Sequence, residues 1–292
     1  MCFMTQSAHR TVRRQHAAVR DDIGELITRR PLPGTTLEQL DPFLFLNHHG
    51  PQHYPPNNRG LPFGPHPHRG FETVTFILEG SLAHADSGDH QSVIETGGVQ
   101  WMTAGSGLVH AEVSPEAFKR DGGALEILQL WINLPARLKM VEPAYTGLQR
   151  DDIPKVELDE GRARLALIAG ALGGETGPIQ SLTDVFMSTL ALSAGARIAL
   201  PVPRERTVFL YVVDGEVSVG GTAVNPHHLI ELEADGDEVL IEAELDARLL
   251  FGHASALNEP MVSYGPFVMN TREEIQQAVE DYQAGRFGGL EI

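Results

Sequence analysis

The sequence predicts an all-β protein built from two similar β-barrels and followed by a short C-terminal α-helix. Short runs rich in β-branched and aromatic residues alternate with Gly and Pro turn signals. The apolar run at 208–213 ends in an Asp-Gly pair, much as the run at 74–78 ends in a Glu-Gly pair. This weak internal repeat suggests that one barrel has been duplicated. The length of 292 residues is sufficient for two domains of about 150 residues each.

The predicted strands of the first barrel lie between residues 42 and 135, and each ends near a glycine or a polar turn. They are 71–78, 83–94 with a turn at 87–89, 99–103, 108–113 and 124–132. Many short strands with regular turn signals are typical of barrels and sandwiches. We therefore assign residues 1–135 to an N-terminal barrel domain.

The remainder of the chain is predicted to hold a linker and a second barrel. Residues 136–163 are irregular and contain prolines, whereas 164–292 are again rich in strands. Near the end, Thr271 and Glu274 have the spacing of a capping box, which opens a helix. Apolar residues then follow at helical spacing, and we expect this stripe to pack on the barrels. They are Ile275, Ala278, Val279 and Tyr282.

The composition excludes several classes of protein. The chain has 39 acidic and 22 basic residues, and its net charge of −17 argues against direct nucleic-acid binding. The single cysteine, Cys2, excludes a disulfide framework, a Cys-based zinc finger and a Cys-ligated iron–sulfur cluster. Apolar runs stay below the roughly 18 to 20 residues of a membrane helix and the about 7 to 15 of a signal peptide core. We therefore expect a cytoplasmic protein with no membrane contact.

The N-terminal segment differs from the rest of the chain in its charge. Residues 1–20 contain four arginines and no acidic residue. We expect a partly ordered arm, with a docking or nucleic-acid-binding segment as the alternative.

Histidines dominate the candidate chemistry, because 13 of them stand beside a single cysteine. His66 and His68 flank a proline, and residues i and i+2 of an extended segment point to the same face. His110 and Glu112 repeat this spacing. Two antiparallel strands would therefore combine three imidazoles and one carboxylate into a mononuclear site for a divalent transition metal. The alternative is two unrelated surface pairs.

Other polar residues near these pairs carry weaker expectations. His48, His49 and His53 precede the first pair, and we expect hydrogen-bonded loop residues, with proton carriers at a cavity mouth as the alternative. His84 and Asp86 flank a turn, and we expect them to face solvent or the rim of the cavity.

Several segments resemble the pirins, which belong to the cupin superfamily. Residues 66–75, His-Pro-His-Arg-Gly-Phe-Glu-Thr-Val-Thr, resemble the family's N-terminal signature, as do 100–105, Gln-Trp-Met-Thr-Ala-Gly. Residues 41–44 and 265–270 resemble its entry and C-terminal segments. The resemblance implies a bicupin of two β-sandwich barrels with metal only in the first. The implied ligands are His66, His68, His110 and Glu112.

The resemblance also implies a function. Pirin relatives are associated with quercetin 2,3-dioxygenase activity, which implies a small aromatic substrate such as a flavonol, together with dioxygen. Iron(II) is the expected metal, and copper, nickel, zinc and manganese stay open. Glu112 would bind the metal and also serve as the catalytic base. The alternative is a non-enzymatic, metal- or redox-dependent regulator that binds a transcription factor or a metabolic enzyme.

The second barrel is expected to lack this ligand set. Aligning the two acidic-Gly turns places Pro201 and Pro203 at the positions of His66 and His68. No histidine occurs between residues 229 and 252, and the pair at 227–228 is expected in a loop.

Overall fold

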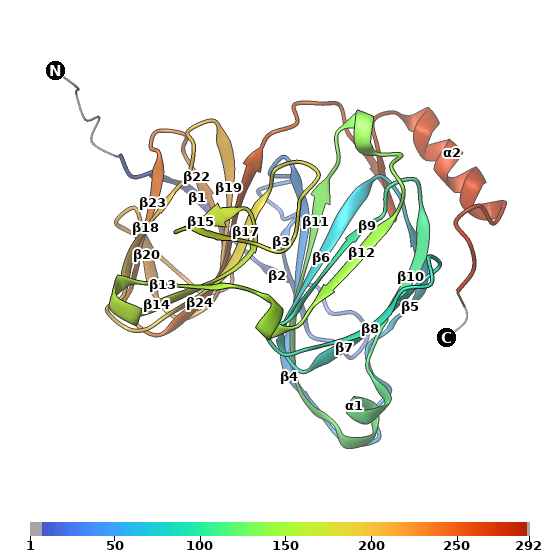
Figure 1. The fold of residues 1–292 in the computed structure, drawn as a ribbon, viewed down its shortest axis with the longest axis horizontal. Coiled ribbons are helices and arrows are strands. Elements are labelled where there is room, and N and C mark those ends of the chain that lie inside the picture. Colours follow the sequence, from blue (N-terminus) through green and yellow to red (C-terminus); the bar gives the residue numbers. More distant parts are fainter. Residues whose placement is uncertain (1–7, 291–292) are drawn as a thin grey trace. The chain divides into compact units, whose positions relative to one another are not determined.

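The computed structural model describes residues 8–290, so Cys2 lies outside the described range. The chain divides into two compact units, each assembled from three segments (Figure 1). Unit 1 comprises Met1–Ala18, Gly34–Leu40 and Ile153–Ala256, and unit 2 comprises Val19–Pro33, Asp41–Asp152 and Leu257–Ile292. Both units consist mainly of antiparallel strands, which confirms the predicted all-β class.

Unit 2 is a barrel of two sheets. The larger sheet has the order β12-β9-β6-β11-β4-β3-β2, and the smaller has the order β5-β10-β7-β8. The strands are β2 (Val19–Arg20), β3 (Thr28–Leu32), β4 (Phe43–Tyr54), β5 (Phe63–His68), β6 (Phe71–Glu79), β7 (Ser81–Asp86), β8 (Gln91–Glu95), β9 (Val99–Thr103), β10 (Leu108–Val113), β11 (Gly123–Asn133) and β12 (Ala144–Leu148). A β25–β26 hairpin (Val262–Tyr264 and Phe267–Met269) and the helices α1 (Glu116–Asp121) and α2 (Arg272–Gln283) complete the unit.

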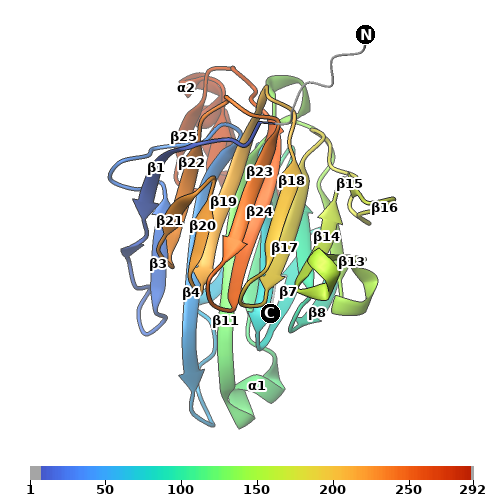
Figure 2. The same cartoon turned by 90° about the vertical axis from the view of Figure 1, so that its left-hand side faces the viewer.

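Unit 1 repeats this arrangement strand for strand. Its larger sheet has the order β1-β22-β19-β24-β17-β14-β13, and its smaller sheet has the order β18-β23-β20-β21 (Figure 2). The strands are β1 (Val12–Ala17), β13 (Lys155–Leu158), β14 (Ala163–Ala169), β17 (Phe186–Leu192), β18 (Arg197–Pro201), β19 (Arg206–Asp214), β20 (Val217–Val219), β21 (Thr222–Val224), β22 (His228–Leu232), β23 (Glu238–Ala243) and β24 (Ala247–Ser255). A short pair, β15 (Ala171–Leu172) and β16 (Glu175–Thr176), lies beside them.

The interior of unit 1 is mainly apolar. One continuous cluster joins both of its sheets and contains Leu210, Ile230 and Phe251, which are all fully buried. Burial of such side chains contributes about 1.5–3 kcal/mol each, so this cluster accounts for much of the stability of the unit.

The compact units differ from the contiguous domains expected at 1–135 and 164–292. The structure groups the C-terminal segment with unit 2, because α2 and the β25–β26 hairpin form an apolar cluster with Val109 and Phe287. It groups the N-terminal segment with unit 1, because β1 pairs with β22. The expected linker at 136–163 contains two edge strands, β12 and β13, as well as short 3₁₀ turns. These pairings join residues that are distant in sequence, so local turn signals do not reveal them.

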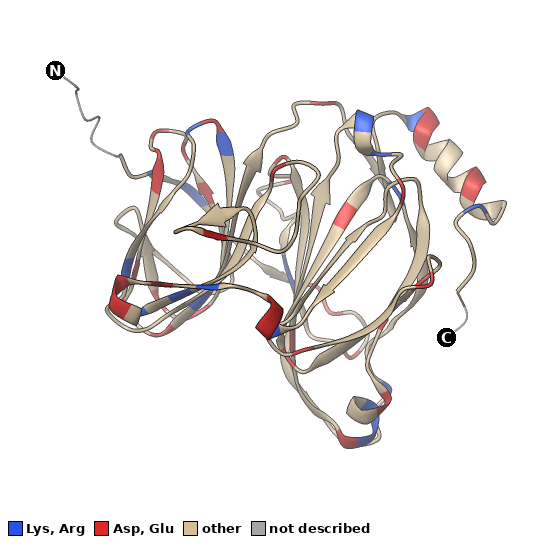
Figure 3. Cartoon of the chain, in the orientation of Figure 1, with Lys and Arg blue, Asp and Glu red and all other residues tan. Residues whose placement is uncertain are grey.

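Helix α2 begins as the sequence predicts. The Thr271 side chain accepts from the Glu274 backbone N–H, and the Glu274 carboxylate accepts from the Thr271 N–H, which completes the capping box. Ile275 and Ala278 are buried, and the acidic residues of the helix stand out in Figure 3. Within residues 8–290 no helix is both long and apolar enough to cross a membrane.

Candidate metal centre

Strands β5 and β10 bring the predicted histidines together. The two strands pair antiparallel, and His110 lies directly opposite His66. Pro67 separates His66 from His68, so both imidazoles leave the same face of β5. A bulge between His110 and Glu112 shifts the register, so that Glu112 pairs with Phe63.

The three imidazoles converge on one point inside unit 2. One ring nitrogen from each of His66, His68 and His110 lies within 4.8 Å of the other two. The Nε2 atoms of His66 and His110 are only 3.0 Å apart. His110 is fully buried and His68 is 4% exposed, whereas His66 is half-buried and marks the more open side of the cluster.

Hydrogen bonds fix the tautomers of two of these rings. The Nδ1 of His66 lies 2.8 Å from the Gly64 carbonyl, and the Nδ1 of His68 lies 3.3 Å from the Pro266 carbonyl. A carbonyl oxygen only accepts, so each Nδ1 carries the proton and each Nε2 presents a lone pair. Metal-binding histidines commonly show this arrangement.

Burial keeps two of the three rings neutral. Burial lowers the pKa of His68 to about 3, and the neighbouring His66 adds to this effect. Burial likewise lowers the pKa of His110 well below its usual value, with His68 and His66 contributing. Neutral imidazoles with facing lone pairs repel one another, and a divalent cation would relieve that repulsion. The donor set therefore fits a transition metal.

Glu112 lies on β10 with His110, but outside the group of three converging histidines. Its carboxylate is buried but does not belong to the three-histidine group. Instead, Oε1 accepts hydrogen bonds from Thr75 Oγ1 at 2.8 Å and from Gln100 Nε2. Oε2 accepts a hydrogen bond from Gln129 Nε2. The structure thus brings three of the four predicted residues together and holds the fourth against the larger sheet.

Aromatic rings line the larger sheet next to His68. Phe71 and Trp131 lie 5.1 and 5.4 Å from the His68 ring, measured between centroids. Phe45 stacks on Trp131 at 4.6 Å. Phe63 lies apart from this group, 5.3 Å from the His49 ring.

The expectation for His84 and Asp86 is wrong, because both side chains are buried rather than at a rim. The Nε2 of His84 lies 3.0 Å from an Asp86 oxygen, and its ring stacks on Tyr145 at 4.0 Å. Tyr145 was not among the predicted site residues, because it lies in the expected linker. Gln100 and Gln129 were not among them either, although polar residues within otherwise apolar strands were an available signal.

The three additional histidines lie in a strand, β4, and not in a loop. His48 is fully buried with its Nε2 3.0 Å from Glu126. His49 contacts Thr28 at 2.9 Å, and burial lowers the pKa of His49 to about 3. His53 is exposed. Two of the three are therefore buried and hydrogen-bonded, and His49 lies beside Phe63 on the inner side of the barrel.

The residues that follow His68 hold the C-terminal segment against the end of β5. Arg69 donates to Asp281 of α2 at 2.8 Å, and its guanidinium lies 4.6 Å from the Phe287 ring centre. Gly70 has a φ of +90°, and a Cβ there would lie 2.0 Å from the Val268 carbonyl oxygen. Only glycine therefore allows this close approach of two backbones.

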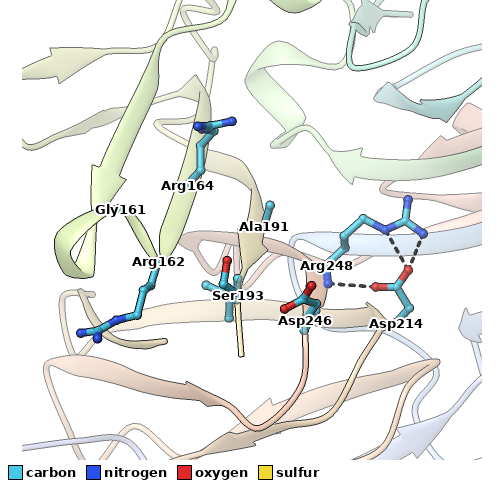
Figure 4. A pocket seen from close by; sticks show the side chains of 10 residues that line it. Gly161, Arg162, Arg164, Ala191, Ser193, Asp214, Asp246 and Arg248 are labelled. Atoms are coloured by element: carbon cyan, nitrogen blue, oxygen red, sulfur yellow. Dashed lines mark hydrogen bonds and ion pairs between the residues drawn. The ribbon is translucent and has the colours of Figure 1, made fainter. Parts of the chain in front are cut away.

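A separate pocket of about 540 Å³ lies in unit 1 and contains none of the predicted site residues (Figure 4). Its arginines are already engaged by carboxylates. Arg162 pairs with Asp159, Arg164 with Glu157, and Arg248 with Asp214. This neutralisation leaves the pocket without an evident catalytic group, so the histidine cluster is the better candidate site.

Comparison with known proteins gives concordant matches. The family model described as Pirin matches residues 25–132, and that described as Pirin C-terminal cupin domain matches residues 187–288. A pirin-like protein of Caulobacter vibrioides is 42% identical over 270 residues, which cover 91% of this chain and 94% of the relative.

Solved structures are similar over comparable lengths. A quercetin 2,3-dioxygenase from Acinetobacter baumannii is 34% identical with a TM-score of 0.89, covering 97% of this chain and 100% of that one. A bacterial pirin from Escherichia coli, solved in complex with nickel(II), shares the fold at 20% identity and a TM-score of 0.66. That match covers 83% of this chain and 99% of that one.

Proposed function

The chain belongs to the pirin family and contains two cupin domains, and on this premise we propose that it is a metal-dependent dioxygenase that cleaves flavonols. The proposal rests above all on the three converging imidazoles of His66, His68 and His110. The name of the similar Acinetobacter enzyme supports quercetin as a substrate. A cytoplasmic location is part of the same proposal.

We propose that His66, His68 and His110 would hold one divalent metal through ring nitrogens, with Glu112 as the fourth group. Iron(II) is our first choice, and nitrogen-rich ligation also suits copper, nickel, zinc and manganese. The bound metal would supply a Lewis acid and a redox centre for dioxygen chemistry. The second barrel would hold no metal in this scheme.

The side chains around the cluster have separate roles in this proposal. Glu112 would accept the proton of the flavonol 3-hydroxyl at Oε2, in exchange for its bond to the metal, because Oε1 already accepts two hydrogen bonds. Phe71 and Trp131 would pack against the aromatic rings of the substrate beside His68. Burial of these groups would exclude water from the reacting atoms.

The decisive experiment loads the purified protein separately with iron(II), manganese, nickel, copper and zinc. The flavonol absorption band is then followed under oxygen, together with carbon monoxide release. We expect metal-dependent loss of the band, and no loss in a His68→Ala control. Stoichiometric metal without turnover for any of the five metals would overturn the enzymatic proposal. It would favour the regulatory alternative, whose partner would then be a protein.

A further inference from the structure

A polar layer crosses the larger sheet of unit 2 behind Glu112. Thr75 on β6 pairs with Gln100 on β9 and with Gln129 on β11, so the three side chains share one face. Thr75 and Gln100 are 1% and 2% exposed. Burying such groups is costly unless they find partners. Here all three donate to the same carboxylate.

The donors divide unequally between the two carboxylate oxygens. Oε1 accepts from both Thr75 and Gln100, whereas Oε2 accepts from Gln129 alone. An ionised carboxylate offers about four lone-pair positions, two on each oxygen. The two donors therefore occupy both positions of Oε1, while Oε2 keeps one position free.

Tyr145 controls the direction in which Gln100 points. Its hydroxyl donates to Gln100 Oε1 at 3.3 Å and lies 2.5 Å from Ser92 Oγ. The Tyr145 ring also stacks on His84 at 4.0 Å, with 12° between the planes. Because the hydroxyl holds the amide oxygen, the amide nitrogen of Gln100 faces Glu112. A flipped amide would place two acceptors against each other.

We propose that Thr75, Gln100 and Gln129 are positioning residues that leave Oε2 as the only oxygen of Glu112 able to bind the metal. Tyr145, which contributes from β12, keeps Gln100 in its donating orientation. This inference rests on the proposed function, because it takes Glu112 as the fourth metal-binding group. It adds four residues to the site that the ligand motif does not contain.

The test uses cobalt(II) alone, because its visible absorption reports the groups bound to it without any need for turnover. Glu112→Gln should change the wild-type cobalt spectrum. Gln129→Leu should weaken cobalt binding by about 10- to 100-fold, the usual effect of losing a residue that orients a metal ligand. Thr75→Val should weaken it less, and Thr75→Ser, which keeps the hydroxyl, should restore the wild-type affinity.

Tyr145→Phe removes a single hydroxyl and should weaken cobalt binding by roughly 10-fold or less. Tyr54→Phe is the matched control, since this buried tyrosine packs on Phe118 within another cluster of unit 2. It should leave cobalt affinity and spectrum unchanged. If Gln129→Leu does not fold, the Thr75→Val and Thr75→Ser pair decides the question.

An unchanged cobalt spectrum in Glu112→Gln would overturn the inference, as would wild-type affinity in both Thr75→Val and Tyr145→Phe. Failure of the proposed function looks different. A wild-type protein that binds cobalt with the expected variant pattern, but cleaves no flavonol under any metal, loses the dioxygenase proposal and keeps the positioning network.

Discussion

The two barrels share one architecture, but the walls of their interiors differ in chemistry. In unit 2 the strand pairing aligns Thr75 with Gln100 and Gln129. In unit 1 the corresponding strands align three apolar residues. These are Leu210, Ile230 and Phe251. The apolar version shows that the fold does not require the polar layer, so the polar layer of unit 2 is best explained by the carboxylate that it holds.

One layer away, the two walls stay alike. Phe45 stacks on Trp131 at 4.6 Å in unit 2, and Phe186 stacks on His253 at 4.7 Å at the corresponding register positions in unit 1. Both units keep this stacked pair. The neighbouring set of three aligned residues is apolar in unit 1 and polar in unit 2. The polar residues that bind Glu112 therefore lie next to a packing pair that both units keep.

The largest expected effect is the loss of metal when a buried histidine is replaced in unit 2 but not when one is replaced in unit 1. His68→Ala removes one of three converging imidazoles, so we expect loss of stoichiometric metal as measured by elemental analysis. His253→Ala is the control, because His253 is also buried and burial lowers its pKa to about 3, but it lies in unit 1. It should retain the metal. Stoichiometric metal in His68→Ala would contradict the assignment.

The next prediction tests whether the apolar interior of unit 1 tolerates the glutamine that unit 2 has at the same register position. Phe251→Gln introduces into unit 1 the residue type that unit 2 carries at the same register position. The amide would be buried without a carboxylate to receive it, and the packing of the ring would be lost. We expect a loss of about 3–5 kcal/mol in the free energy of unfolding, measured in urea. A loss below about 1 kcal/mol would show that the apolar layer is not needed for stability.

The sequence predicted what depends on neighbours along the chain. Residues 108–113 form β10 with the predicted bounds, and the i, i+2 spacing placed His66 and His68 on one face. The same spacing also holds in unit 1, but on the neighbouring residues. There the buried positions are Leu200 and Val202, while Pro201 is exposed. Matching the turns alone aligned the strands without fixing which side chains point inward.

The rest depends on contacts between distant segments. Tyr145 reaches Gln100 only because β12 pairs with β9, and Asp281 reaches Arg69 across 212 residues of sequence. The burial of His84 follows from β7 lying between β8 and β10. Periodicity and turn signals carry no information about such pairings, so the linker and the domain boundaries were placed differently from the structure.

The terminal segments give a second comparison. One arginine hydrogen-bonds the N-terminal segment within unit 1, and another hydrogen-bonds the C-terminal segment within unit 2. In unit 1, Arg10 donates to the backbone carbonyls of Pro203, Arg204 and Arg206. In unit 2, Arg69 donates to the Asp281 carboxylate. Carbonyls do not titrate, whereas a carboxylate does. The anchor of unit 2 is therefore expected to be the one that is sensitive to acid.

Asp281→Asn tests this difference. The hydrogen bond from Arg69 lowers the pKa of Asp281 below its usual 3.8. The stabilisation is therefore present above that value and is lost as the pH falls through the lower folded-state pKa. At pH 7 we expect the variant to lose about 1.5–3 kcal/mol, and this deficit should shrink towards pH 3. Urea unfolding at both pH values measures this difference in stability. A deficit that does not depend on pH would contradict the role of the ionised Asp281 carboxylate.

The smallest effect concerns α2, which has no counterpart among the described elements of unit 1. Thr271→Ala removes the hydroxyl that accepts from the Glu274 N–H, and the loss of such a cap typically costs about 1 kcal/mol. Thr271→Ser keeps the hydroxyl and serves as the control. Because the capping box lies at the start of the helix and Asp281 lies near its end, the Arg69 contact should persist. Cobalt affinity should then stay at the wild-type value in both variants, while only the alanine variant unfolds at a lower urea concentration. A parallel loss of cobalt affinity in Thr271→Ala would instead show that the whole of α2, and not Asp281 alone, keeps β5 and its histidines in position.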